Sequence, residues 1–410
     1  MEEVFDYPKE IIESANQYLA SNGIMFKKDT CSDTFSYNPA PISLRPSPFP
    51  KNVYDSIRYN QTSVNSLVDI LMRNIDKVIA LLDPLAKIDP FIASLIKITQ
   101  EVQKLPYHQI GYLGILRTDY MITDDKQAKL VELNTIASGL GAISTLMADF
   151  YRYIKFIGAS YTSKHHSSYD VENIADDNDN INGIVDAMKQ AHDLYIEKRG
   201  ELVNRPIMAY IVDYEEANIC DQKHIENTLF FKHKLVSRRL TFADINEYCE
   251  LKETGELVYK GREEITVVYY RSGYSPTQYR SDEDWEARET LEKSLAVKCP
   301  SVALQLLTFK KIQELLSRPS VWHELVGPAD FDEIKGLFAG QMWGFEEITP
   351  EIEEVIADAK MNPEKYVLKT QREGGGNNYF GDDIPHILEK TEDLMQYSLM
   401  KRIFPKEFEG

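Results

Sequence analysis

A glycine-rich segment near the C-terminal end is the strongest candidate for chemistry in this sequence. It reads KTQREGGGNN from Lys369 to Asn378 and follows a short predicted strand over 366–368. Three consecutive glycines carry no Cβ atoms, so backbone N–H groups can approach an anion closely. Lys369 and Arg372 add local positive charge. The pattern is neither the P-loop GxxxxGK[ST] nor the Rossmann GxGxxG, and we favour a phosphate-binding loop over a plain flexible turn.

A predicted hairpin could supply ligands for a metal ion. Its strands are expected over 111–122 and 129–136, joined by a polar turn. Residues i and i+2 of a strand share a face, so Arg117 projects with Asp119, and Glu132 projects with Asn134. A carboxylate and an amide oxygen suit Mg²⁺, which also takes phosphate oxygens and water. On the pattern alone, however, the solvent face of an amphipathic hairpin is favoured over a metal site.

Polar residues also follow the predicted strand 207–212. Ligands tend to bind beyond the carboxyl ends of strands in α/β modules, so the segment 216–222 is a candidate binding segment. Asp221 within it is expected both to cap the following helix, 223–231, and to take part in binding.

Two cations are weaker candidates. Arg271 follows the predicted strand 265–270 and could clamp a carboxylate bidentately, although a surface ion pair is the favoured explanation. Lys310 lies at the start of a predicted helix, where a lysine is usually solvated. The sequence has no Ser/His/Asp or Cys/His order for covalent catalysis and no HExxH motif or cysteine cluster for zinc.

The elements that must position these residues form three expected regions. The regions are 1–204 with the N-terminal helices and hairpin, 205–304 as an inserted α/β module, and 305–410 with the glycine-rich loop. Helices are expected at 10–19, 64–82, 91–102, 139–157, 184–196, 223–231, 283–294, 309–317 and near 384–394. Further strands are expected at 257–259 and 397–403. The proline-rich segment 37–51 is expected to be an extended loop, and the polar segment 163–182 receives no structure.

Composition excludes several classes of protein. The chain has 410 residues, with 46 Lys plus Arg and 65 Asp plus Glu, so its formal charge is −19. This charge argues against nucleic-acid binding, although a local phosphate site stays open. No apolar stretch is long enough to span a membrane, and the acidic N-terminus does not resemble a secretory signal. Four widely spaced cysteines fit a reduced, cytoplasmic protein.

Taken together, these segments resemble the eukaryotic type of glutathione synthetase, an ATP-grasp ligase. The most specific match is VLKTQREGGGNNYFG, and the resemblance keeps the order of the motifs along the whole chain. The other matching segments are LRTDYM (116–121), VELNTIASG (131–139), EEANICDQ (215–222), VVYYRSGY (267–274), DWEAR (284–288) and LTFKKIQ (307–313).

The resemblance implies a fold and an activity. The expected fold is α/β (α+β) and ATP-grasp-like, with an N-terminal helical region and an inserted parallel α/β substrate-binding module. The expected activity is glutathione synthase, an ATP-dependent ligase that joins glycine to γ-glutamylcysteine through an acyl phosphate. Such chemistry needs positioned cations and a metal on phosphate oxygens rather than a protein nucleophile. The family also implies a homodimer that uses ATP and Mg²⁺.

The resemblance implies roles for individual residues as well. Mg²⁺ would be held by Glu132, Asn134 and Glu373. The ATP site would comprise Glu132, Lys310, Lys369, Glu373, Gly374, Gly375, Gly376, Asn377, Asn378, Met400, Lys401, Arg402 and Ile403. The dipeptide would be held by Arg117, Ser138, Glu216, Asn218, Gln222, Arg271 and Tyr274. Arg117 would also stabilise the transferring phosphate, which makes it the expected catalytic residue.

Several departures from the family pattern leave alternatives open. The segment 137–139 lacks the family's paired serines, Thr370 replaces a proline, Phe380 lacks a phenol, and Lys401 stands where an acid is common. The family also continues beyond the segment that ends here at Gly410, with a further metal ligand, an arginine and a lid. The alternatives are therefore a truncated or impaired homologue that binds nucleotide or thiol peptide, and a ligase that uses another acceptor amine.

Overall fold

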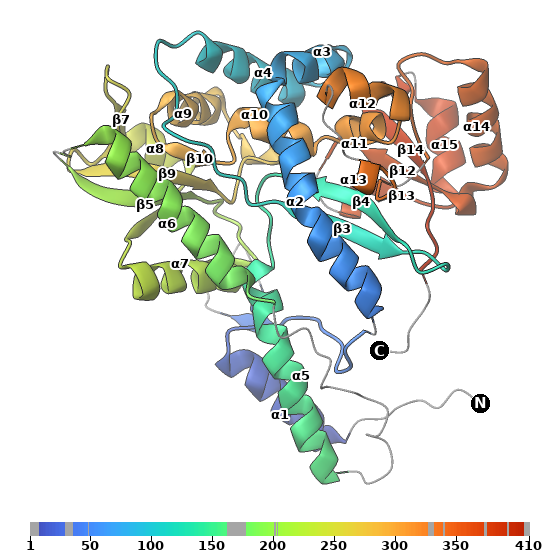
Figure 1. Ribbon diagram of the computed structural model, residues 1–410, viewed down its shortest axis with the longest axis horizontal. Coiled ribbons are helices and arrows are strands. Elements are labelled where there is room, and N and C mark those ends of the chain that lie inside the picture. Colours follow the sequence, from blue (N-terminus) through green and yellow to red (C-terminus); the bar gives the residue numbers. More distant parts are fainter. Residues whose placement is uncertain are drawn as a thin grey trace.

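The β3–β4 hairpin occupies the centre of the molecule, between two larger sheets (Figure 1). The computed structural model describes residues 8–28, 36–47, 49–161, 178–200, 202, 204–326, 332–338, 341–372, 375–391 and 393–405. The hairpin comprises β3 (Arg117–Ile122) and β4 (Ala128–Asn134), so its first strand begins later than the predicted 111. Because the two sheets approach it from opposite sides, the hairpin can collect side chains from both.

The N-terminal region is helical, as predicted. Its elements are α1 (Lys9–Ser21), β1 (Met25–Lys27), β2 (Tyr37–Pro39), α2 (Lys51–Arg73), α3 (Ile75–Ala86), α4 (Pro90–Gln103), α5 (Gly141–Tyr161) and α6 (Asn180–Arg199). The single helix predicted over 64–82 is wrong, because the chain breaks at Asn74 and α3 continues past Pro84. The apolar residues of α2 and of α3 pack into the same core, so the apolar periodicity continues across Asn74 and does not reveal the break. Most of the segment 163–182 lies outside the described residues.

The central module is a mixed sheet covered by helices. Its elements are β5 (Arg205–Ile211), α7 (Ile219–His233), β6 (Ser237–Leu240), α8 (Phe242–Tyr248), β7 (Cys249–Leu251), β8 (Leu257–Tyr259), β9 (Glu263–Tyr270), α9 (Asp282–Lys293), β10 (Val297–Cys299) and α10 (Val302–Gln305). The strand order is β6-β5-β9-β8-β7, with β10 also on β9. β5, β6, β9 and β10 run parallel, as predicted for the inserted module, whereas β7 and β8 add two antiparallel strands that the prediction did not include. The cause is local: Lys260 and Gly261 adopt positive φ and turn β8 directly into β9.

The C-terminal region is an antiparallel sheet with helices on one face and the hairpin and a further helix on the other side (Figure 1). Its elements are α11 (Lys310–Leu316), α12 (Pro319–Val326), α13 (Asp332–Lys335), β11 (Met342–Gly344), α14 (Pro350–Met361), β12 (Tyr366–Thr370), β13 (Asn378–Tyr379), α15 (Asp383–Lys390) and β14 (Tyr397–Lys401), with the strand order β11-β14-β12-β13. Leu368 and Leu399 pack with Ile384 under α14 and α15. Val367 and Met400, on the opposite face, pack with Val131 of the hairpin, and α11 lies on the same side.

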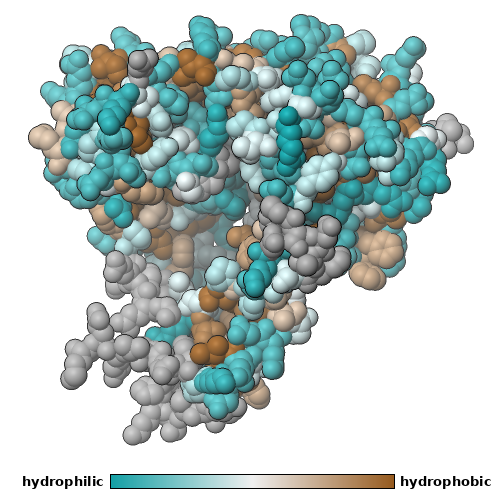
Figure 2. Space-filling model, turned by 180° about the vertical axis from the view of Figure 1, so that it is seen from behind, coloured by the Kyte–Doolittle hydropathy of each residue, from teal (hydrophilic) through white to brown (hydrophobic). Residues whose placement is uncertain are grey.

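The surface agrees with the acidic composition. Hydrophilic residues cover most of the face seen in Figure 2, and hydrophobic residues gather on the lower projection formed by α1 and α5. Phe156 on α5 is 76% exposed and Ile12 on α1 is 42% exposed. No helix among the described residues is long and apolar enough to cross a membrane.

Asp221 joins the central module to α5. The carboxylate is 1% exposed and accepts hydrogen bonds from the backbone N–H groups of Leu140 (2.9 Å), Ala142 (3.0 Å) and Ile143 (3.0 Å). The prediction that Asp221 caps the helix 223–231 is wrong, because α7 begins at Ile219 and already includes it. Asp221 instead satisfies free N–H groups at the start of α5, where the helix dipole favours a negative charge.

We predict that Asp221→Ala lowers the free energy of unfolding by about 2–4 kcal/mol, because two buried N–H groups and a partly buried one lose their acceptor. Denaturant unfolding measures the change. Asp193→Ala, at an exposed position on α6, is the control and should cost about 0.5 kcal/mol or less. Equal losses for the two variants would contradict the capping role.

Candidate functional site

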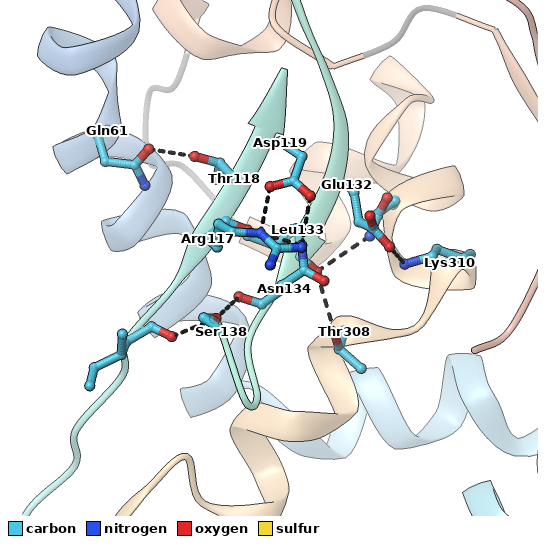
Figure 3. A network of polar contacts seen from close by, with 12 residues as sticks. Gln61, Arg117, Thr118, Asp119, Glu132, Leu133, Asn134, Ser138, Thr308 and Lys310 are labelled. Atoms are coloured by element: carbon cyan, nitrogen blue, oxygen red, sulfur yellow. Dashed lines mark hydrogen bonds and ion pairs between the residues drawn. The ribbon is translucent and has the colours of Figure 1, made fainter. Parts of the chain in front are cut away.

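One face of the hairpin gathers four polar side chains (Figure 3). Arg117 lies opposite Asn134 in the strand register, and Asp119 lies opposite Glu132. Arg117 donates bidentately to Asp119, with distances of 2.7 and 2.9 Å, and the Asn134 amide nitrogen donates to the same carboxylate at 3.2 Å. The predicted sharing of a face is confirmed. The favoured solvent-facing explanation is wrong for Asn134, which is 3% exposed, and for Glu132, whose side chain is 18% exposed. The side chains of Arg117 and Asp119 are 42% and 32% exposed, so the β3 side of this face does reach solvent.

Lys310 reaches this face from α11. Its Nζ donates to Glu132 Oε1 at 2.5 Å, and its side chain is 3% exposed, so the expectation of a solvated lysine is wrong. The reason is that every residue of α11 is buried. Burial raises the pKa of the Glu132 carboxyl, but the nearby cations, Lys310 first and then Lys369 and Arg117, outweigh it and hold the pKa below its usual value. Glu132 is therefore a carboxylate at neutral pH.

Lys369 reaches the same strand from β12. Its Nζ donates to the backbone carbonyl of Val131 at 2.7 Å, and the residue is 6% exposed. The glycine-rich loop begins directly after β12. Glu373 and Gly374 lie outside the described residues, whereas Gly375, Gly376 and Asn377 form a short 3₁₀ turn and Asn378 pairs with Lys369 in β13. Two buried lysines from different elements thus converge on β4 beside the loop.

The strand β14 contributes an apolar patch next to these lysines. Met400 is buried and packs with Val367, and Val131 and Ile403 lie against them. Lys401 and Arg402, by contrast, are exposed, and the Arg402 guanidinium lies 5.0 Å from the centre of the Phe404 ring. The patch can therefore offer an apolar surface, and the unusual Lys401 points its charge to solvent.

A cavity of about 250 Å³ adjoins the other end of the hairpin. Its wall includes six of the seven residues expected at the dipeptide site: Arg117, Ser138, Glu216, Asn218, Arg271 and Tyr274. Arg271 is 6% exposed and donates to the Ser138 carbonyl at 2.7 Å, so the favoured surface ion pair is wrong. Gly139 lets these groups meet, because a Cβ there would lie 3.1 Å from Asn218 and 3.2 Å from Arg271. Asn218 Oδ1 and Arg271 Nε are buried and have no hydrogen-bond partner among the residues that the structure describes, so a ligand could use them.

Two residues expected at the dipeptide site, Gln222 and Ser138, use their side chains for contacts within the protein. Gln222 does not line the cavity; its amide donates to Glu216 and accepts from Arg239 at 2.7 Å, so it orients Glu216 instead. The Ser138 hydroxyl donates to the backbone carbonyls of Ile115 (3.1 Å) and Asn134 (3.2 Å), so it braces the segment after β4.

Asp89 is a site residue that the sequence patterns did not single out. Its carboxylate caps α4 through the N–H groups of Phe91 (3.0 Å) and Ile92 (3.4 Å) and accepts from Arg372 at 2.6 Å. Arg372 also lies over the Phe91 ring, 5.7 Å from its centre. The sequence Asp89-Pro90 is typical of a helix start, so the capping role could have been predicted. The contact with Arg372 could not, because the two residues are far apart in sequence.

A hairpin, an antiparallel sheet and two lysines converging beside a glycine-rich loop are consistent with an ATP-grasp-like fold. The chain belongs to the eukaryotic glutathione synthase family, whose ATP-binding domain matches residues 6–410. The chain is 33% identical to the chloroplastic glutathione synthetase of Solanum lycopersicum over 90% of its length, and it covers 65% of that protein. It is 35% identical to the Xenopus laevis glutathione synthetase and 33% identical to the human one, covering 77% and 83% of them and matching over 92% and 98% of this chain.

A solved structure supports the same fold. A glutathione synthetase-like effector of Globodera pallida aligns with a TM-score of 0.66 over 99% of this chain and 84% of that one, at 18% identity. The comparisons thus confirm the resemblance inferred from the motifs and the ATP-grasp-like fold. They also support glutathione synthase function, which implies an ATP-dependent ligase.

We predict that Asp89→Asn raises the KM for ATP about threefold to tenfold in an assay of ATP consumption, with a smaller change in kcat. The amide still accepts the helix-capping N–H bonds but loses the charge that holds Arg372 beside the loop. Asp83→Asn, an exposed position on α3, is the matched control and should leave both constants unchanged. A KM equal to that of the unaltered protein would show that Asp89 does not position the loop.

Proposed function

We propose that this chain ligates glycine to γ-glutamylcysteine with the hydrolysis of ATP to ADP and phosphate. The observation that carries the proposal is the arrangement on the hairpin. Buried Lys310 pairs with Glu132, buried Lys369 donates to the carbonyl of the adjacent Val131, and the polar cavity lies at the Arg117 end of the same strands. ATP phosphates would lie over the lysines, the glycine-rich loop and Asn377. The adenine would lie against the patch that includes Met400 and Ile403.

The cavity suits a small zwitterionic peptide. Arg117 and Arg271 offer guanidinium groups to carboxylates, and Glu216 offers a carboxylate to an amine. Asn218 and Tyr274 add neutral hydrogen-bonding groups. The terminal carboxylate of γ-glutamylcysteine would therefore face the hairpin, where Arg117 stands between the cavity and the phosphates.

The residues present also fit Mg²⁺. Glu132 is a carboxylate at neutral pH, and Asn134 donates through its amide nitrogen, which leaves its oxygen available as a ligand. Among the described residues no group of three His, Cys, Asp or Glu side chains could hold a metal by itself, so phosphate oxygens would complete the coordination, with Glu373 as a further ligand. The bound ion would neutralise charge on the ATP phosphates.

These positions support a two-step reaction. A carboxylate oxygen of the dipeptide attacks the γ-phosphorus and ADP leaves, which gives an acyl phosphate. Lys310, Lys369 and Arg117 supply positive charge where negative charge accumulates, which is the main contribution a protein makes to phosphoryl transfer. The glycine amine then displaces phosphate to form the amide. The family resemblance further supports a homodimer, and the exposed Ile12 and Phe156 on the α1–α5 projection are side chains that a second copy would cover. The widely spaced cysteines support a cytoplasmic location.

The test is ADP release measured with γ-glutamylcysteine and glycine supplied singly and together. The proposal expects turnover only with both, and a mass corresponding to glutathione. Binding of ATP without turnover under any combination would contradict it and would favour a non-catalytic binding protein. Faster turnover with β-alanine or serine than with glycine would instead indicate a ligase with another acceptor.

We predict that Arg271→Met raises the KM for γ-glutamylcysteine about tenfold or more and leaves the KM for ATP unchanged, because a charged hydrogen-bond donor is lost only from the cavity. Initial rates at varied dipeptide concentration measure the effect. The control, Arg205→Met, removes an arginine that is 61% exposed and lies away from the cavity. A dipeptide KM equal in the two variants would remove Arg271 from the dipeptide site.

A further inference from the structure

A second, larger cavity lies apart from the proposed ligase site. It has a volume of about 570 Å³ and shares no lining residue with the dipeptide cavity. Its wall comes from α2, α3 and α4, from the connection that follows α4, and from α9, β10 and α10, which lie together in the upper part of Figure 1. This volume is in the range of cavities that bind small organic molecules.

A buried lysine forms part of the cavity wall. Lys298, on β10, is 1% exposed, and its Nζ donates to the backbone carbonyl of Ser294 at 2.6 Å. An ammonium group has three N–H donors, and this bond uses one of them. None of the ion pairs formed by the described residues involves Lys298. Its charge therefore has hydrogen-bonding capacity that the surrounding protein leaves unused.

The charged side chains near Lys298 do not neutralise its positive charge. Glu292, which also lines the cavity, pairs with Arg288 at 3.0 Å and accepts from the backbone N–H of Val302 at 3.0 Å. Arg288 is fully buried, so two buried cations share one carboxylate. Burial lowers the pKa of Lys298 to about 8, partly offset by Glu292, so the ammonium form still predominates at pH 7. A buried excess positive charge is costly unless an anion accompanies it.

Part of the remaining wall is suited to an apolar ligand body. The other part is polar and is lined by Arg73, Thr99, Gln103, His108, Gln109 and Ser301. In the apolar part, Met72, Ile75, Val102 and Val302 present aliphatic side chains, and Tyr112 adds a ring. A multiply charged ligand such as inorganic phosphate would lose much of its hydration against these groups. A monoanion matches the single excess charge and leaves the aliphatic wall for contact with carbon.

We propose that this cavity is a binding site for a small organic carboxylate with an apolar body, whose carboxylate pairs with Lys298. The site is independent of the proposed ligase function, since it uses none of the residues assigned to ATP or the dipeptide. A carboxylate bound there would be the counterion that Lys298 lacks, and the apolar body of the ligand would cover the apolar part of the cavity wall.

The test uses 3-phenylpropionate as the probe and its neutral amide, 3-phenylpropionamide, as the matched control. Saturation-transfer NMR titrations on the full chain measure both. The proposal expects the carboxylate to bind about tenfold or more tightly than the amide. Equal binding of the two probes, or binding of neither at millimolar concentration, would overturn it.

Two variants locate the bound probe. Lys298→Met removes the charge, and Ala303→Trp fills the cavity but keeps the lysine. Each variant should bind the probe about tenfold or more weakly. Lys293→Met, on α9 outside the cavity, should bind as the unaltered chain does. Because Ala303→Trp does not remove a buried charge, it decides the question if Lys298→Met fails to fold. Undiminished binding by a folded variant of either kind would overturn the assignment.

Discussion

The ion pair between Lys310 and Glu132 is the interaction on which the proposed active site depends. It joins α11 to the hairpin across a large separation in sequence, and both partners are largely buried. A pair of this kind contributes little net stability, because removing two charges from water costs about as much as their attraction returns. The ion pair instead fixes the positions of its two charged groups. It holds a cation and a carboxylate where phosphate oxygens and a metal ion would be bound, so little reorganisation is needed during phosphoryl transfer.

Three further contacts keep the surrounding regions on the hairpin. Asp221 ties the central module to the start of α5, and Arg271 ties it to the Ser138 carbonyl just after β4. On the other side, Asp89 ties Arg372 of the glycine-rich segment to the N-terminal helices. Each contact pairs a buried charge with backbone groups or with an opposite charge, which makes it directional as well as attractive. The dipeptide cavity and the lysine pair are thereby held at neighbouring positions on one short hairpin.

Local patterns predicted much of the fold and of the site. Alternation placed Arg117, Asp119, Glu132 and Asn134 on one face, and helical periodicity located α1, α4 and α11. The errors arose where distant residues decide the outcome. Lys310 and Arg271 look like surface cations until the partners that bury them are known, and Asp221 looks like the cap of its own helix because α5 is distant in sequence. Asn74 breaks a helix whose apolar stripe continues on both sides, and α12, α13, α14 and β11 carry no pattern strong enough to have been predicted.

The dependence of turnover on Mg²⁺ in Glu132→Gln tests the central claim most directly. Glutamine keeps the size of the side chain and can still accept from Lys310, so the fold should persist, which thermal unfolding checks. If Glu132 holds the metal ion, the Mg²⁺ concentration for half-maximal ADP release rises about tenfold or more, with a much smaller loss of stability. An unchanged Mg²⁺ requirement, or a loss of turnover matched by an equal loss of stability, would contradict it.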